Sequence, residues 1–145
     1  MTDSIRIAIL FEYPSLNGGE RSMLAVIDEL SNQNSQFEFV AIAPPSGPLA
    51  TALSHRKIDV VPFEQNETST TRKAPELLKN ELQTIVDRIQ PGILHANSLA
   101  MGRLTGSIAD RLSCCCLSHL RDIMRISKAA MATAQGNQIS HLLRY

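Results

Sequence analysis

The stretch FEYPSLNGGERSMLAVI, residues 11–27, joins the end of an apolar run to an apolar helical pattern through two adjacent glycines. The run that precedes it, residues 5–11, is almost continuously apolar, as expected for a strand covered on both faces. After the glycines, apolar side chains recur at helical spacing, at Met23, Leu24, Ile27 and Leu30. The stretch therefore predicts a strand, a turn and a helix, the first unit of an α/β fold.

The alternation of strands and helices continues along the chain. Further strands are predicted for residues 37–43, 59–63, 93–96 and 114–117, and a sixth strand for the last residues, from 138 onward. Helices are predicted for residues 49–55, 75–90 and 127–134, and for a segment capped by Ser98 with Met101, Leu104, Ile108 and Leu112 on its inner face. We therefore expect one domain, residues 1–145, with a doubly wound, Rossmann-like parallel sheet and helices on both faces.

Composition and charge exclude several classes of protein. Fourteen basic residues balance fourteen acidic ones, so no net field favours nucleic acid. Six Lys or Arg residues are scattered over residues 103–145, which allows at most a peripheral membrane contact. The first ten residues, MTDSIRIAIL, lack the apolar region of a signal peptide, and no run approaches the ~20 apolar residues of a membrane span. We expect a soluble, cytoplasmic protein.

The three cysteines are consecutive, at Cys114, Cys115 and Cys116. Neighbours on a strand point to opposite faces, so these residues make a poor disulfide framework and a poor zinc site. A buried strand of small apolar thiols in a reducing compartment explains them better. We therefore expect neither a metal nor an organic cofactor.

Gly18 and Gly19 stand where the first predicted helix begins. Unpaired backbone amides and the helix dipole favour an anion at such a point by about 0.3–1 kcal/mol per interaction, and glycine lets the anion approach closely. The pair is therefore a candidate phosphate site, with Arg21 as a cation that would assist it. The alternative is a tight turn that needs a positive φ angle. Neither the dinucleotide pattern G-x-G-x-x-G nor a P-loop is present.

Polar side chains gather in the segments that leave the predicted strands. Ligands of doubly wound sheets bind at the carboxyl ends of the strands, near the switch in strand order. The candidates on this rim are Glu12, Asn17, His95, Asn97, Ser98, His119, Arg121 and Asp122. For His95 the alternative is a hydrogen-bonded core histidine.

Four segments together resemble the amino-terminal domain of glycosyltransferase family 4. They are YPSLNGGERSMLAVIDEL, GPLATAL before KIDVVPF, IQPGILHANSLAMGRLTG and CLSHLRD, and they cover most of residues 5–122. In that family two Rossmann-like domains face each other in the GT-B arrangement, the first binding mainly the acceptor and the second the nucleotide sugar. The resemblance implies that Gly18 and Gly19 approach the donor phosphate, and that His95, Asn97 and Ser98 contact sugar.

One departure from the family concerns the segment after the fifth strand. Family members commonly carry a histidine followed by an aspartate there, whereas Arg121 precedes Asp122 here and His119 lies two positions earlier. Arginine is no base at neutral pH, although it binds phosphate or carboxylate bidentately. Three interpretations stay open: His119 takes the catalytic place beside Asp122, Arg121 binds an anionic acceptor, or Arg121 and Asp122 form a surface pair.

The resemblance implies half of a GT-B enzyme, with the carboxyl-terminal donor domain absent. Such a hexosyltransferase-like enzyme transfers a sugar from a nucleotide-sugar donor to a sugar or lipid-linked acceptor. We expect this half to be inactive or incomplete alone and to need a separate donor-domain polypeptide. The alternatives are a stand-alone sugar- or nucleotide-binding module without catalysis, and a decayed fragment without a site.

Overall fold

The structure is a computed structural model that describes residues 4–33 and 36–119. Strands and helices alternate along these residues: β1 (Ile5–Leu10), α1 (Gly18–Gln33), β2 (Phe37–Ala43), α2 (Pro48–His55), β3 (Asp59–Pro62), α3 (Pro75–Ile89), β4 (Ile93–Ala96), α4 (Leu99–Gly106), a 3₁₀ turn (Ala109–Arg111) and β5 (Cys115–Ser118). The helix and the sixth strand predicted beyond residue 126 lie outside the described residues. None of the helices described is long and apolar enough to cross a bilayer.

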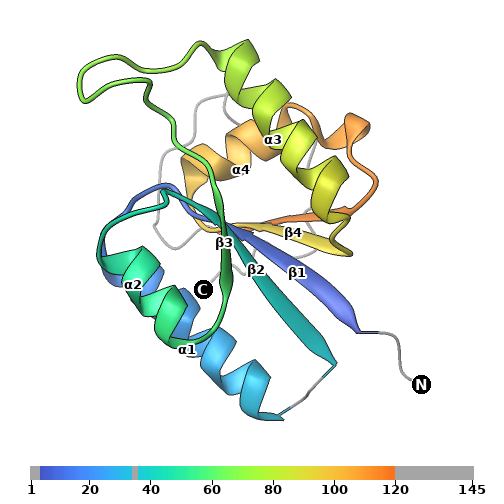
Figure 1. Cartoon of the computed structure of the whole chain (residues 1–145). Helices are drawn as coiled ribbons and strands as arrows, with labels where there is room; N and C mark the ends of the chain where they lie inside the picture. The colour runs from blue at the N-terminus through green and yellow to red at the C-terminus, as the bar shows by residue number, and fades with distance from the viewer. Residues whose placement is uncertain (1–3, 34–35, 120–145) are drawn as a thin grey trace, which may run out of the picture.

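The five strands form one parallel sheet in the order β3-β2-β1-β4-β5. The chain builds outward from β1 through β2 to β3, and then returns to the other side of β1 for β4 and β5 (Figure 1). The switch in strand order therefore lies between β1 and β4. This is the doubly wound arrangement that the sequence predicts.

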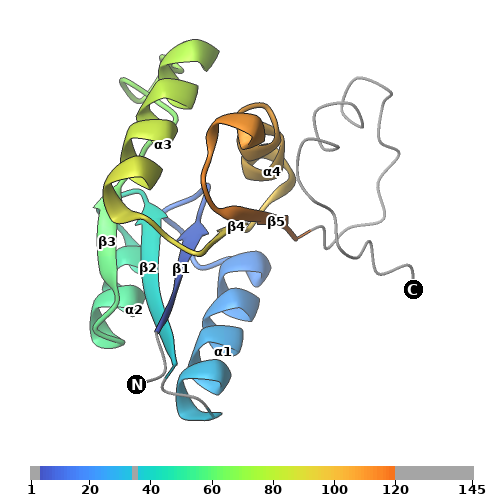
Figure 2. The ribbon, with the colours of Figure 1, turned by 90° about the vertical axis from the view of Figure 1, so that its right-hand side faces the viewer.

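Helices cover both faces of the sheet, with α1 and α2 on one face and α3 and α4 on the other (Figures 1 and 2). The side chains of β1 alternate between two apolar clusters. Ile7 and Ile9 pack with residues of α1 and α2, whereas Ala8 and Leu10 pack with residues of α3 and α4. A strand that is buried on both faces explains the nearly continuous apolar run at the start of the sequence.

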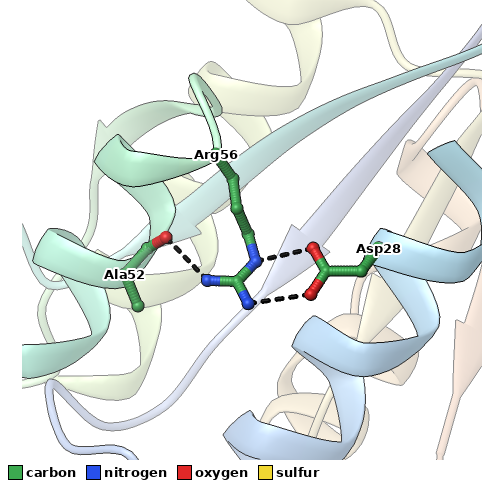
Figure 3. Close-up of polar contacts among 3 residues, drawn as sticks. All are labelled: Asp28, Ala52 and Arg56. Atoms are coloured by element: carbon green, nitrogen blue, oxygen red, sulfur yellow. Dashed lines mark hydrogen bonds and ion pairs between the residues drawn. The ribbon is translucent and has the colours of Figure 1, made fainter. Parts of the chain in front are cut away.

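A bidentate ion pair joins α1 to the end of α2 on their shared face (Figure 3). Arg56 donates from Nε and Nη2 to the two carboxylate oxygens of Asp28, at 2.7 and 2.8 Å, and from Nη1 to the carbonyl oxygen of Ala52 at 2.9 Å. The hydrogen bonds from the guanidinium lower the pKa of Asp28. This pair adds a direct polar contact between two helices that pack in the same apolar cluster.

The helix predicted after Ser98 is shorter than expected. One inner face was expected to run from Met101 to Leu112, but α4 ends at Gly106, and Ile108 and Leu112 belong to the 3₁₀ turn and its flanks. Glycine is a poor helix former, and the following Ser107 turns its hydroxyl back to the carbonyl of Leu104 at 2.7 Å. Ile108 is nevertheless fully buried in the core. The prediction that it faces inward is therefore confirmed, whereas the prediction that the helix extends to it is wrong.

The strand of cysteines also differs from the expectation of burial. It begins at Cys115 instead of residue 114, and only Cys116 is buried, while Cys114 is half-buried and Cys115 is exposed. Within the described part of the chain β5 has one neighbour, β4, and so lies at an edge of the sheet. An edge strand has less cover than a central one, which explains why a single thiol enters the core.

Candidate functional site

The candidate site lies where the carboxyl ends of β1 and β4 meet at the switch point. After β1 the chain turns through residues 11–17 into α1, and after β4 it passes through Asn97 and Ser98 into α4. The backbone amide of Asn97 donates to the carbonyl of Leu10 at 3.0 Å, which extends the ladder between the two strands. The topology therefore brings the glycine turn and the segment 95–98 to the same rim.

Gly18 and Gly19 form the first residues of α1. The first amide to reach a carbonyl four residues earlier is that of Arg21, which donates to Asn17 at 3.0 Å, so the amides of Gly18, Gly19 and Glu20 precede the helical ladder. Gly18 is exposed, and a Cβ placed on it meets no atom within 4 Å. Because both glycines are helical, the alternative of a turn with positive φ is wrong for this pair.

Glu20 caps the helix from inside its first turn. Its side chain is 6% exposed, and its Oε2 accepts a hydrogen bond from the backbone amide of Asn17 at 3.0 Å. This is one half of a capping box, and a carboxylate there is also favoured by the helix dipole. The spacing of Asn17 and Glu20 carried this signal in the sequence, but Glu20 was not among the predicted residues.

Asn97 is buried behind the glycine turn, with 3% of its surface exposed. Its Nδ2 donates to the carbonyl oxygen of Gly19 at 3.3 Å. Asn97 thus ties the end of β4 to the first turn of α1. The structure places this residue in a position that orients the turn.

Glu12 and Ser98 are in direct contact across the switch point. The hydroxyl of Ser98 donates to Glu12 Oε2 at 2.7 Å and accepts from the amide of Met101 at 3.2 Å, which confirms Ser98 as the cap of α4. A hydrogen bond from Tyr13 to the Glu12 carboxylate is the main cause that raises the pKa of the phenol, and the negative charge of Glu12 adds to it. One carboxylate therefore joins both loops of the rim.

His95 and His119 lie side by side at the ends of β4 and β5. His95 pairs in register with Leu117, and the amide of His119 donates to the carbonyl of Ala96 at 3.0 Å. The two ring centroids are 5.8 Å apart, with the ring planes inclined at 44°. Arg121 and Asp122 lie outside the described residues. The pairing of His119 with Asp122 stays a prediction.

A cleft of 580 Å³ opens beside Glu12. Its lining residues come from three strand ends: Glu12, Tyr13, Pro14, Pro44, residues 64–69 and Arg72. The loop after β3, which extends from the carboxyl edge of the sheet (Figure 1), closes on itself through amide–carbonyl bonds of 2.8 Å from Glu67 to Thr71 and from Lys73 to Gln65. Tyr13 and Arg72 were not predicted, because only the folded loop brings them together.

A single glycine anchors the loop that carries Glu12 and Tyr13. Gly47 has a φ of 105°, and a Cβ there would lie 2.9 Å from the carbonyl oxygen of Pro14. The same carbonyl accepts a hydrogen bond from the amide of Leu49 at 2.9 Å. The turn between β2 and α2 therefore fixes the loop between β1 and α1.

Comparisons with known proteins find similarity among solved structures. No protein-family model matches the sequence, and no curated protein matches it significantly. Three crystal structures of Anabaena Alr3699/HepE are similar in fold. The complex with UDP has a TM-score of 0.62 and 19% identity over 90% of this chain, and the complexes with UDP-glucose and with UDP and glucose have TM-scores of 0.58, with 15% and 16% identity over 82%.

The chain spans about a third of the length of these structures, 34% of the first and 30% of the other two. At this level of identity the likeness establishes the fold, which is a Rossmann-like α/β domain with a parallel sheet. The same fold is found in a protein whose crystal structures contain a nucleotide and a nucleotide sugar.

Proposed function

We propose that this chain is the acceptor-side, amino-terminal half of a GT-B glycosyltransferase of the family 4 type. The diphosphate of a nucleotide sugar would lie against the amides of Gly18 and Gly19. The observation that carries the proposal is the open first turn of α1 at the switch point, since Gly18 leaves space for an oxyanion and has no conformational need to be glycine. The fold shared with the UDP-glucose complex of HepE supports this assignment.

The charges around α1 predict weak binding by this half alone. The amides and the helix dipole favour a phosphate, but two carboxylates, Glu12 and Glu20, lie at the same mouth. Arg21, the nearest cation in the first turn, is exposed and donates from Nε to the carbonyl of Leu16 at 3.0 Å. Most of the positive charge that a departing diphosphate requires would therefore come from a donor domain.

The proposed reaction breaks the bond between the anomeric carbon and the diphosphate oxygen and forms a bond to an acceptor hydroxyl. His119 and Asp122 are the proposed catalytic pair, and His95 and Ser98 contact sugar at the adjacent strand ends. Asn97 acts by orienting Gly19, with which it shares a hydrogen bond. Glu12, Asn17 and Arg121 complete the proposed set of substrate contacts.

The cleft beside Glu12 is where we place the acceptor. It shares Glu12 with the glycine turn and Ser98, so a group bound in it would lie next to the proposed donor phosphate. Its walls supply hydroxyls from Thr68 and Ser69 and an exposed aromatic ring from Tyr13. Hydroxyls and an aromatic face suit a carbohydrate, which presents both polar and apolar surfaces.

Calorimetric titration of the full chain with UDP and UDP-glucose tests the phosphate site. We expect Gly18→Val to weaken binding at least about tenfold, which corresponds to about 1.4 kcal/mol, because the side chain would occupy the space of the phosphate. Ala25→Val is the matched control, since it places the same β-branched side chain on an exposed position of the same helix. Equal affinity in the two variants would remove the phosphate assignment.

A binding module without catalysis is the second candidate, favoured by the weak positive charge around α1, where Arg21 is exposed and the carboxylates of Glu12 and Glu20 lie nearby. A sugar-transfer assay, run with the chain alone and with a donor-domain polypeptide, separates the two functions. Turnover that needs both polypeptides supports the transferase half. Binding without turnover in either case supports the module, and the absence of binding supports a fragment without a site.

A further inference from the structure

A second cavity lies at the amino end of β5, away from the rim that carries the candidate site. It has a volume of 610 Å³ and is lined by Gly106, Ala109, Asp110, Leu112, Cys114, Cys115 and Cys116. All the strands are parallel, so the amino end of β5 lies at one end of the strands and the rim with His119 lies at the other end. The three thiols at this cavity have no part in the proposed sugar chemistry.

Two of the three thiols lie on the same side of the sheet, because Cys116 belongs to the apolar cluster beneath α3 and α4 and Cys114 packs against that cluster. Cys116 is 4% exposed and packs in the core, and its Sγ lies 3.7 Å from the carbonyl oxygen of Cys114, to which it donates. Cys114 is half-buried and Cys115 is exposed on the other side. Cys114 thus combines access from the cavity with a second thiol as its immediate neighbour.

The interaction between the two thiols makes them chemically different. Cys116 lowers the pKa of Cys114, and main-chain hydrogen bonds act in the same direction although burial opposes them. The interaction with Cys114 is the main cause that raises the pKa of Cys116, with burial next. The thiolate form, which is the nucleophile, is therefore favoured at Cys114, while the proton stays on Cys116.

We propose that Cys114 and Cys116 form an oxidisable thiol pair, in which Cys114 attacks a hydroperoxide from the cavity and Cys116 then closes a disulfide with it. In the first step the Cys114 thiolate forms an S–O bond with hydrogen peroxide, the O–O bond breaks, and hydroxide leaves. In the second step the Cys116 thiol attacks the sulfenic sulfur. An S–S bond forms, the S–O bond breaks, and the thiol proton leaves with the hydroxyl as water.

The backbone geometry allows this disulfide to form. Even two residues of fully extended chain advance only about 6.6–6.8 Å, which is the upper end of the Cα separations of about 4.4–6.8 Å that disulfides span. Cys114 also precedes the first residue of β5 and lies in a bend, so it can move without breaking a pair of the ladder. Once Cys114 is oxidised, its charge no longer holds the proton on Cys116.

Accessibility alone predicts a different outcome. Cys115 is the exposed thiol and would be the first to react if exposure decided the order. Within residues 4–33 and 36–119, no group of three or more His, Cys, Asp or Glu side chains is placed to hold a metal ion. Thiol oxidation is thus the chemistry that this cluster supports best. The first thiol to react distinguishes an oxidisable pair, which begins at Cys114, from reaction governed by exposure, which begins at Cys115.

The test is treatment of the full chain with hydrogen peroxide, followed by alkylation and peptide mass spectrometry. We expect the wild type to lose two alkylatable thiols through a disulfide between residues 114 and 116. Cys115→Ser, the matched control at the exposed position, should form the same disulfide at the same rate. Cys116→Ser should stop at a sulfenic acid on Cys114, which dimedone labels, and Cys114→Ser should show no internal disulfide.

Several results would overturn the proposal. Oxidation that begins at Cys115, or that yields dimers linked through it, would show that exposure alone governs the chemistry. Persistence of a disulfide in Cys114→Ser would do the same. Because Cys116 lies in the core, Cys116→Ala, which adds no polar atom, is measured beside Cys116→Ser, and trapping of the sulfenic acid must occur in both.

Discussion

Among the residues of the rim, Glu12 connects more of the site than any other side chain we describe. It accepts a hydrogen bond from Ser98, it raises the pKa of Tyr13, it lines the cleft, and it lies two residues after the end of β1. A carboxylate with this set of neighbours adds negative charge to both the proposed phosphate site and the proposed acceptor site. Removal of the Glu12 charge should therefore change the pKa of a neighbouring side chain.

Replacement of Glu12 by glutamine should lower the pKa of Tyr13 toward the ordinary value of 10.0 for a phenol. The carboxylate stabilises the protonated phenol, through a hydrogen bond first and its charge second, so loss of the charge makes deprotonation easier. Ultraviolet titration of the phenolate in a Tyr145→Phe background, where Tyr13 is the one tyrosine left, measures this change. Ser98→Ala is the control, because it retains the charge of Glu12 and should leave the phenol raised.

For single residues, the sequence predicted correctly those roles that depend on nearby positions in the chain. Ser98 was predicted as a cap, and Gly18 was predicted at the start of a helix, because both signals are local. Tyr13 and Arg72 were not predicted, since their roles depend on a loop that folds back from the third strand. Asn97 was predicted as a sugar contact, whereas burial against Gly19 became visible only in the folded chain.

At the scale of elements, the pair of α1 and α2 shows how two helices on one face are held in place. The ion pair between Asp28 and Arg56 is bidentate but about a third to a half exposed, at 45% and 31% of the side chains. Exposed pairs contribute about 0.2–1 kcal/mol. The contact should therefore add a small and pH-dependent amount to stability.

Asp28→Asn should reduce the free energy of unfolding by about 0.2–1 kcal/mol at neutral pH. The folded state holds the pKa of Asp28 below its ordinary value of 3.8, so this contribution is fully present above that value and is lost as the pH falls through the folded pKa. Urea unfolding of both proteins at neutral and acidic pH should show the difference shrinking below pH 3.8. Glu29→Gln removes a carboxylate from the same helix and should leave the Arg56 contact intact, and an equal pH dependence in that variant would contradict the assignment.

Every strand and α-helix of the described chain was predicted from the sequence pattern, and most bounds agree to within a residue or two. The error at α4 has a clear cause, since Met101, Leu104 and Ile108 satisfy a helical spacing that Gly106 and Ser107 interrupt. The cysteine strand was displaced because an edge position cannot be deduced from a short apolar run. Strand order comes from tertiary pairing, which the sequence indicates only through fold class.

For the molecule as a whole, the sheet divides the interior into two apolar clusters. Ile42 of β2 packs with the α3 and α4 side, and Ile27 of α1 packs with the other. Both are almost fully buried, at 0% and 2%. Substitutions in the two clusters should therefore act independently.

Ile42→Val and Ile27→Val should each cost about 0.5–1.5 kcal/mol of unfolding free energy. In the double variant the losses should add to within about 0.3–0.5 kcal/mol, because the two side chains belong to separate apolar clusters on opposite faces of the sheet. Denaturant unfolding of the four proteins measures this cycle. A larger coupling, with unchanged dependence on denaturant, would show that the sheet transmits packing changes between its faces.

The position of β1 in the middle of the sheet has a consequence for the order in which the ribosome delivers the strands. β1 can pair with β2 as soon as β2 is synthesised. Its second neighbour is β4, so Leu10 cannot pair with Ala96 until the ribosome has added that strand. Until then the nascent chain can complete only the half that contains β1, β2 and β3. Until β4 is added, the backbone hydrogen-bonding groups on one side of β1 have no partner strand. The apolar side chains that α4 covers in the folded domain are exposed to solvent during this time.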